Sequence, residues 1–286
     1  GTCSVSGSSG AKLGKLTGDA SILLKVTSGV LDLGGDLTEF SGTLTIDAGG
    51  TVRFTGSAGG PDAAFHLGSA AGAVSVRLNA PLVRMGSLEG GTATTLRGHS
   101  NVNVPMTFEI GGRDSDTVFS GRLLNGAGGA AATVALRKVG AGALTLAGAN
   151  AHTGGTVVDS GTLNLLGDHT GANGSLTLNP LNEAAATVNI GGAAQTSATS
   201  AAFAAAAAVQ AGSDGTSMNG FANQTMLVEG SAGFATTVSN AGSLLVGRSA
   251  LMRVRTNATW TQSGSLRIRG VGGYAATLAL NAGGTL

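Results

Sequence analysis

Apolar and polar residues alternate in short runs along most of this sequence. In the segments Leu144–Leu146 and Leu163–Leu165, two leucines flank a Thr and an Asn, respectively. A period of two places the leucines on one face of a strand and the polar residue on the other. The pattern therefore predicts many short β-strands, each with one buried face.

A unit of Gly, a small residue and Leu recurs at the start of these strands. Its leucines are Leu44, Leu144, Leu163, Leu176, Leu244, Leu266 and Leu286. The unit's glycines are 19 residues apart from Gly142 to Gly161, 22 from Gly242 to Gly264, and 20 from there to Gly284. Such a period indicates a solenoid, because about 20 residues are too few for a four-stranded propeller blade but suffice for one coil of a β-helix.

We therefore predict an all-β fold, a right-handed parallel β-helix (β-solenoid) with Gly-rich turns. Leucines such as Leu44, Leu144, Leu163, Leu176, Leu266 and Leu278 should lie in one continuous core, with successive coils stacked about 4.8 Å apart. An antiparallel sandwich also uses short alternating strands and is the alternative.

Composition favours the solenoid. The 286 residues include 50 Gly, and aromatic residues make up 3% of the chain, whereas compact domains rely on large aromatics for much of their core. Glycine shows no three-residue period and there are only four Pro, which excludes collagen. Apolar β-forming residues recur regularly, which argues against disorder.

We interpret residues 1–286 as a single continuous solenoid segment of a longer chain, because the sequence begins without Met and stops inside an apparent strand. Residues 193–220 are rich in Ala, Ser and Gly and are expected to be an irregular insertion. Within it, residues 200–211 should form a short helix, because Ala has the highest helix propensity, or a bulged loop.

Charge and cysteine content narrow the choice of partners. A net charge of +1 gives no bulk attraction to nucleic acid. No run of about 18 apolar residues is present, so no transmembrane helix is expected. Cys3 is the only cysteine, which excludes an intrachain disulfide.

No motif predicts catalysis, a metal or a cofactor. Asp114 and Asp116 follow two glycines and are interpreted as a solvated turn, with a lone calcium site as the alternative; their spacing gives no evidence of the cleft that a glycosidase needs. The four histidines, at 66, 99, 152 and 169, are scattered and are interpreted as turn residues rather than metal ligands. We expect the chain not to be an enzyme.

One charge feature suggests binding. No acidic residue follows Glu229, yet Arg253, Arg255, Arg267 and Arg269 do, in two pairs of the same spacing. Each pair should share a strand face, and stacked coils could align both pairs into a ladder for an anionic partner such as a surface polysaccharide. A solvated face that tolerates like charges is the alternative.

The segment Lys138–Leu163 (KVGAGALTLAGANAHTGGTVVDSGTL) resembles the autotransporter-associated β-strand repeat. Related stretches lie at 65–137, and weaker ones at 29–55 and from 225 onward. This repeat occurs in autotransporter passengers and in very long surface proteins of Verrucomicrobia and Planctomycetes. The resemblance implies a parallel β-helix, export to the cell surface, and a scaffold or adhesive role without a conserved active site.

The expected function is thus that of a structural, extracellular β-solenoid stalk or fibre segment of a bacterial surface protein, with self-association into fibres or adhesion as added roles. The alternative is a carbohydrate-binding or polysaccharide-cleaving β-helix module. Clustered acids in a groove would indicate the enzyme. Exposed aromatics would indicate the sugar binder, and Trp260 and Tyr274 are the few candidates.

Overall fold

The computed structural model describes residues 1–6, 10–47, 49–70, 73–76, 80–178, 185–211, 224–247, 249–270, 275–280 and 284–286, without the side chains of Val5, Ser75, Val76 and Gln224. The chain divides into two compact units, Gly1–Leu144 and Thr145–Leu286, called unit 1 and unit 2. The described residues form β-strands and no helix, which confirms the all-β prediction.

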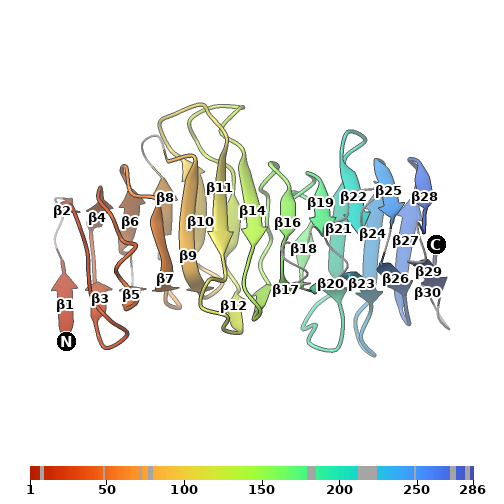
Figure 1. Ribbon diagram of the computed structural model, residues 1–286, viewed down its shortest axis with the longest axis horizontal. Helices are drawn as coiled ribbons and strands as arrows, with labels where there is room; N and C mark the ends of the chain where they lie inside the picture. The colour runs from red at the N-terminus through yellow and green to blue at the C-terminus, as the bar shows by residue number, and fades with distance from the viewer. Residues whose placement is uncertain are drawn as a thin grey trace. The chain divides into compact units, whose positions relative to one another are not determined.

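Unit 1 contains two parallel sheets whose strands alternate along the chain (Figure 1). Sheet 1 consists of β1 (Thr2–Val5), β3 (Leu23–Val26), β5 (Thr43–Ile46), β7 (Gly59–His66), β9 (Leu82–Glu89), β11 (Met106–Ile110) and β14 (Val134–Lys138). Sheet 2 consists of β2 (Ala11–Leu13), β4 (Val30–Leu33), β6 (Thr51–Phe54), β8 (Ala73–Val76), β10 (Thr95–His99) and β13 (Arg122–Leu124). The short strand β12 (Thr117–Phe119) bridges in parallel to Gly90.

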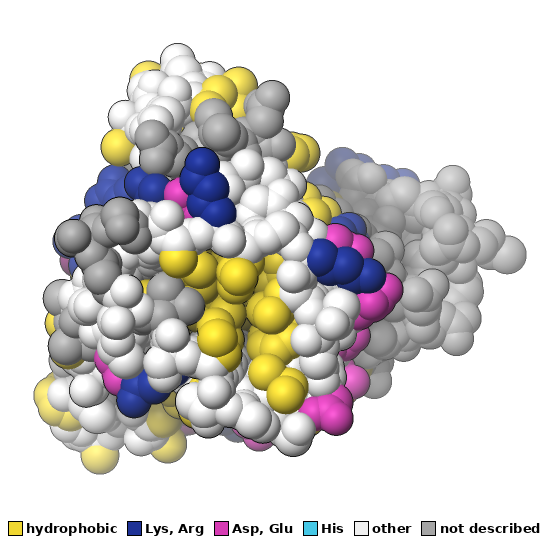
Figure 2. Space-filling model, turned by 90° about the vertical axis from the view of Figure 1, so that its left-hand side faces the viewer, with side chains coloured by type: hydrophobic (Ala, Val, Ile, Leu, Met, Phe, Trp, Pro, Cys, Tyr) yellow, Lys and Arg dark blue, Asp and Glu magenta, His cyan; other side chains and the backbone are white. Residues whose placement is uncertain are grey.

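Successive coils of unit 1 place like residues on top of one another. In sheet 1, Leu24 pairs with Leu44, which pairs with Phe65, and all three are buried. Figure 2 faces the end of this unit, where hydrophobic side chains gather in the middle and polar and charged ones surround them. The alternating sequence pattern thus becomes an apolar interior with a polar exterior.

Charged residues on the outside of unit 1 pair from coil to coil. The carboxylate of Glu109 lies 3.1 Å from both Arg84 and Arg137, its register partners on the two neighbouring strands. The Arg53 guanidinium likewise donates two hydrogen bonds to Asp32 of the preceding coil. Opposite charges on adjacent rungs of a sheet favour one register over a slipped one.

Unit 2 contains three parallel sheets, so each coil contributes three strands (Figure 1). Sheet 3 consists of β16 (Thr156–Val158), β19 (Leu176–Leu178), β22 (Ala208–Ala211), β25 (Ser243–Val246) and β28 (Leu266–Ile268). Sheet 4 contains β17 (Gly161–Leu165), β20 (Ala186–Gly191), β23 (Gln224–Glu229), β26 (Ala250–Val254) and β29 (Ala276–Leu280). Sheet 5 consists of β18 (Asp168–His169), β21 (Thr199–Phe203), β24 (Thr236–Asn240), β27 (Ala258–Gln262) and β30 (Gly284–Thr285). The remaining strand, β15 (Ala143–Leu146), contains the residues at which the units divide.

The strand registers confirm the parallel β-helix and exclude the antiparallel sandwich, because the described strand pairs are parallel. In sheet 4 the buried column runs through Val188, Met226 and Met252. In sheet 5, Trp260 is fully buried and its ring lies 6.2 Å from that of Phe203. Large side chains therefore supply core volume in unit 2 even though the sequence contains few of them.

The prediction of a helix near 200–211 is wrong. Residues Thr199–Phe203 and Ala208–Ala211 are the strands β21 and β22, which pair with β24 and β25. Pairing on the stack gives the backbone its hydrogen bonds and buries every second residue, and this outweighs the weak preference of Ala for a helix. Residues 212–220 of the expected insertion lie outside the described residues.

Most of the leucines expected in the core are buried. Leu44, Leu144, Leu163 and Leu176 are at most 1% exposed. Leu266, in contrast, is 42% exposed, and Leu278 is half-buried. Both belong to the last described strands of their sheets, where no further described coil covers them.

The coil length varies more than the sequence period suggested. Sheet 1 advances 20 residues from Leu24 to Leu44, whereas sheet 3 advances 33 from Leu176 to Val209. The 22-residue step from Gly242 to Gly264 is a true coil step, because Leu244 pairs with Leu266. The 20-residue step from Gly264 to Gly284 joins sheets 3 and 5 and is not a repeat of the same strand.

Candidate functional site

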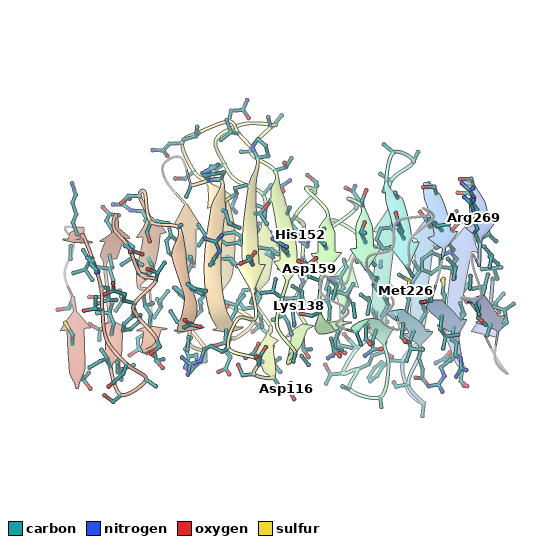
Figure 3. All side chains as sticks on the ribbon, in the orientation of Figure 1. Asp116, Lys138, His152, Asp159, Met226 and Arg269 are labelled. Atoms are coloured by element: carbon teal, nitrogen blue, oxygen red, sulfur yellow. The ribbon has the colours of Figure 1, made fainter. Side chains whose placement is uncertain are left out.

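The four arginines of the expected ladder lie on two sheets of unit 2. Arg253 is in β26 of sheet 4, in register with Leu227 and Ala279, and Arg255 follows it. Arg267 is in β28 of sheet 3, in register with Leu245, and Arg269 follows it (Figure 3). The two pairs therefore do not stack into one ladder as we expected. Binding of an anionic partner by either pair stays a prediction.

One arginine of the first pair forms an ion pair within the protein. Arg255 donates to the Glu229 carboxylate at 3.2 Å, and both side chains are about one-third exposed. Glu229 is the last acidic residue in the sequence. The negative charge that pairs with Arg255 therefore comes from the preceding coil. The Arg253 Nε atom is buried and has no hydrogen-bond partner.

Beside this ion pair, the outer face of sheet 4 is hollowed into a groove of about 250 Å³. Its floor includes Thr145, Asn164, Asn189 and Leu227, which come from successive coils. Its wall is the turn Gly191–Ala194 after β20, and Glu229 closes one side. We call these residues the sheet-4 groove.

An amide ladder runs along the floor of the groove. Asn164 Nδ2 donates to Thr145 Oγ1 at 3.0 Å, and Asn189 Nδ2 donates to Asn164 Oδ1 at 2.8 Å. Asn189 Oδ1 has no hydrogen-bond partner, since the next residue in register is the apolar Leu227. Sequence reasoning missed this ladder, although an Asn between two apolar residues in both Leu163–Leu165 and Val188–Ile190 was its visible signal.

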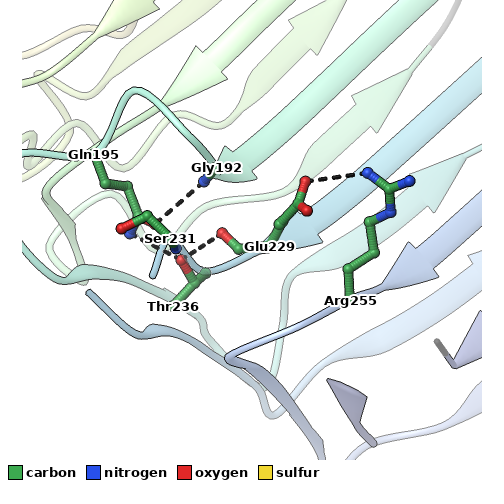
Figure 4. Close-up of polar contacts among 6 residues, drawn as sticks. All are labelled: Gly192, Gln195, Glu229, Ser231, Thr236 and Arg255. Carbon is green, nitrogen blue, oxygen red and sulfur yellow. Dashed lines mark hydrogen bonds and ion pairs between the residues drawn. The ribbon is translucent and has the colours of Figure 1, made fainter. Parts of the chain in front are cut away.

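The wall of the groove is held by Gln195, which is 7% exposed (Figure 4). Gln195 Oε1 accepts hydrogen bonds from the Gly192 and Ser231 amides, at 3.2 and 2.9 Å. Its Nε2 atom donates to the Thr199 and Thr236 hydroxyls, at 2.9 and 3.0 Å. One buried side chain thus ties the turn to three other segments of unit 2.

Glycine is required where this turn begins. Gly191 has a φ of 79°, a left-handed conformation that residues with a β-carbon rarely adopt. A β-carbon there would also collide with the Thr236 side chain and the backbone oxygen of Glu229. The Thr236 hydroxyl donates to that oxygen at 2.8 Å, which fixes the end of β23.

Neither aromatic candidate for a sugar platform is on a described surface. Trp260 is 0% exposed and stacks on Phe203, so it belongs to the core. Tyr274 lies outside the described residues.

The Asp114–Asp116 turn of unit 1 has a structural role. Asp114 Oδ1 accepts from the Ala141 amide at 2.6 Å, and Asp116 Oδ1 accepts from the Ala143 amide at 2.8 Å. The two carboxylates therefore hold the turn of the following coil, 27 residues along the chain. The part of the chain that the structure describes contains no group of three or more potential metal ligands.

Near this turn, Lys138 points into unit 1 and is 1% exposed (Figure 3). Its Nζ donates to the backbone oxygens of Val139 and Gly140 at 2.7 and 2.8 Å. Burial lowers the pKa of Lys138 to about 8, while the charges of Asp114 and Asp116 raise it in part. The lysine thus replaces water as the donor for two carbonyls at the bend.

Two of the histidines expected in turns are buried in unit 2. His169 Nε2 lies 3.0 Å from the Leu166 oxygen, which can only accept, and His169 Nδ1 lies 3.2 Å from the Asn150 amide nitrogen, which can only donate. These partners require a neutral ring with its proton on Nε2. His152 Nε2 contacts the Thr156 hydroxyl at 3.0 Å.

Burial has a large effect on both rings. It lowers the pKa of His152 to about 3 and that of His169 to about 4. Each stays neutral at ordinary pH because a charge in the apolar interior would lose its hydration. They are structural groups whose protonation would disrupt the core.

Comparison with known proteins identifies the repeat. Residues 136–165 match the family described as passenger-associated-transport-repeat. The chain carries an autotransporter-associated repeat. The match covers the segment on which the sequence resemblance was based and confirms it, and no curated protein matches the chain.

The autotransporter-associated repeat and the parallel coils together support a passenger-type β-helix. The repeat includes β14, with the buried Lys138, and continues through His152 and β17. Some of its polar side chains hold a bend, as Lys138 does, and others join neighbouring strands, as Asn164 and Thr145 do. No helix among the described residues has the length and apolar character to cross a membrane.

Proposed function

We propose that this chain is a structural stalk or fibre segment on the outside of a bacterial cell. The observation that carries the proposal is the stacking of parallel coils that contain an autotransporter-associated repeat. In such a stack each coil contacts mainly its neighbours, so length is gained by adding coils. A stack of this kind suits a protein that spaces or presents other domains.

Self-association is part of the proposal. Leu266, Ile268 and Leu280, on the last described strands of sheets 3 and 4, are 42–52% exposed. Another coil, from this chain or from a second copy, could bury them by adding strands in parallel.

Surface exposure can be tested directly. Antibodies raised against the folded chain should label intact cells of the source organism, because a passenger-type segment faces the medium. Labelling should disappear after brief protease treatment of intact cells, while a cytoplasmic marker protein stays undigested. Labelling that requires permeabilised cells would contradict the proposal.

We further propose that the chain is not an enzyme, since Asp114 and Asp116 are engaged in holding a turn. The purified protein should leave pectin and alginate uncut, with or without calcium, as measured by the absorbance of unsaturated products and by reducing ends. Cleavage that is lost in Asp114→Ala or Asp116→Ala would show that these carboxylates are catalytic after all.

A further inference from the structure

The sheet-4 groove has the features of a built binding site. Its wall is the turn Gly191–Ala194, which Gln195 holds through hydrogen bonds at both ends of its amide. A turn fixed in this way loses little conformational freedom when a ligand binds. On the floor, Asn164 is already held in place by hydrogen bonds to Thr145 and Asn189.

The chemistry of the lining indicates the class of ligand. It offers amides and a hydroxyl, which donate and accept, beside the half-buried apolar side chains of Leu166 and Leu227. The lining contains no Lys, Arg or His, and its one acid, Glu229, is paired with Arg255. An anionic ligand would therefore meet no cation in the groove and one carboxylate. A neutral ligand with many hydroxyl groups and an apolar face fits all of these groups.

One polar atom on the floor is left for a ligand. Asn189 Oδ1 is buried and accepts no hydrogen bond, which costs free energy in the unbound protein. The terminal torsion of Asn is soft, so a small rotation of this amide would present Oδ1 to a donor seated in the groove.

We propose that the sheet-4 groove binds a neutral saccharide, one sugar unit of a longer chain at a time. Its volume of about 250 Å³ lies below the range of about 300–1,000 Å³ that is usual for pockets of larger ligands. Ring hydroxyls bond to Asn164, Asn189 and Glu229, and the C–H face of the ring packs on Leu227. This adds contact with a polysaccharide to the structural role proposed above.

The affinity of a single groove is expected to be weak. The described lining contains no aromatic side chain, so it lacks the stacking platform that contributes much of the binding in stronger sites. A dissociation constant on the order of 1 mM is expected for a short oligosaccharide. Many copies on one surface would raise the effective affinity without new contacts.

The test is a titration of the full chain with the neutral hexasaccharides cellohexaose and maltohexaose, followed by ligand-observed NMR. Wild-type protein should bind at least one of them saturably. Asn189→Leu removes the amide with its orphan acceptor and should weaken binding by about 10-fold or more. The matched control is Thr277→Leu, an exposed polar residue on β29 of the same sheet outside the groove, which should leave binding unchanged.

A second variant tests the groove without changing its floor, in case Asn189→Leu fails to fold. Ala194→Trp fills the groove from the exposed turn without touching the floor and should also abolish binding. Trp260 fluorescence of Asn189→Leu and Thr277→Leu checks that unit 2 is folded, and circular dichroism does so for Ala194→Trp.

Three results would overturn the proposal: no saturable binding of either hexasaccharide, binding that Asn189→Leu and Ala194→Trp leave intact, or preference for a hexagalacturonate over both neutral sugars. None of these would affect the structural role, which surface labelling tests independently.

Discussion

Acidification from about pH 7 to about pH 4 is expected to destabilise unit 2 by several kcal/mol, because each unit of pKa shift corresponds to about 1.4 kcal/mol. The cause is the burial of His152 and His169, which lowers their pKa values to about 3 and about 4 from an ordinary value of 6.5. In the unfolded chain both rings regain water and titrate normally.

The direction follows from proton uptake. Above about pH 6.5 both rings are neutral in the folded and unfolded states, so they contribute no pH dependence. Between 6.5 and the folded values, the unfolded chain binds protons that the folded chain does not, and stability falls as the pH falls. A proton on His169 Nδ1 would face the Asn150 amide N–H₂ group that now donates to it, so protonation also breaks a hydrogen bond.

Trp260, the single tryptophan, is fully buried in unit 2 and reports its unfolding by fluorescence. Urea titrations are made at several pH values between about 4.5 and 7. This pH range lies above the ordinary carboxyl pKa values, so it isolates the contribution of the histidines to the unfolding free energy. His152→Gln should flatten the pH dependence of the unfolding free energy. As a control, His66→Gln removes a half-exposed ring of unit 1 and leaves both buried rings in place.

A wild-type stability that is constant across this range would show that the rings are accessible to water in the folded state. An equal slope in wild type and His152→Gln would assign the dependence to other groups.

Replacing Leu244 by Ala is expected to cost about 2–5 kcal/mol, whereas the same change at its register partner Leu266 should cost less than about 1 kcal/mol. The two leucines occupy equivalent places on adjacent strands of sheet 3. Leu244 is 1% exposed and Leu266 is 42% exposed, so only the first substitution leaves a cavity. Because residue type and strand position are the same, a difference between the two variants in the free energy of unfolding reports the effect of burial.

Urea unfolding followed by Trp260 fluorescence measures both variants in the same unit. If Leu266→Ala proved as costly as Leu244→Ala, the last described coil would have to be covered in solution, for instance by a second copy. Concentration dependence of the Leu266→Ala effect would then identify such association. If both changes were mild, the apolar column would not be the main source of stability.

Much of the fold could be predicted because it depends on local pattern. Leucines at every second position, preceded by Gly and a small residue, were enough to predict parallel coils with Leu44 and Leu163 in the core, and both are buried. The same periodicity could not distinguish a residue with a covering coil from one without, so Leu266 was wrongly placed in the core.

Local propensity was misleading where neighbouring strands supplied the stronger interaction. Residues 200–211 are Ala-rich and were expected to be helical or looped, yet they form β21 and β22 on edges that the preceding coil offers. The prediction that the four arginines stack into one ladder was wrong for a related reason. A two-residue spacing shows which side chains share a strand face, but not which sheet the strand joins.

The repeating coil, its apolar core and its resemblance to autotransporter-associated repeats can be predicted from residue order over about 20 positions. Which polar residues meet depends on how the coils stack. Asn164 and Asn189 become adjacent because the coil between them is 25 residues long. Gln195 likewise reaches Thr236, 41 residues away, because the coils between them bring the two residues together. Coil lengths vary with the turns, and a change of one residue would move a strand's side chains to the opposite face. The groove therefore depends on the register of the neighbouring coils that line it.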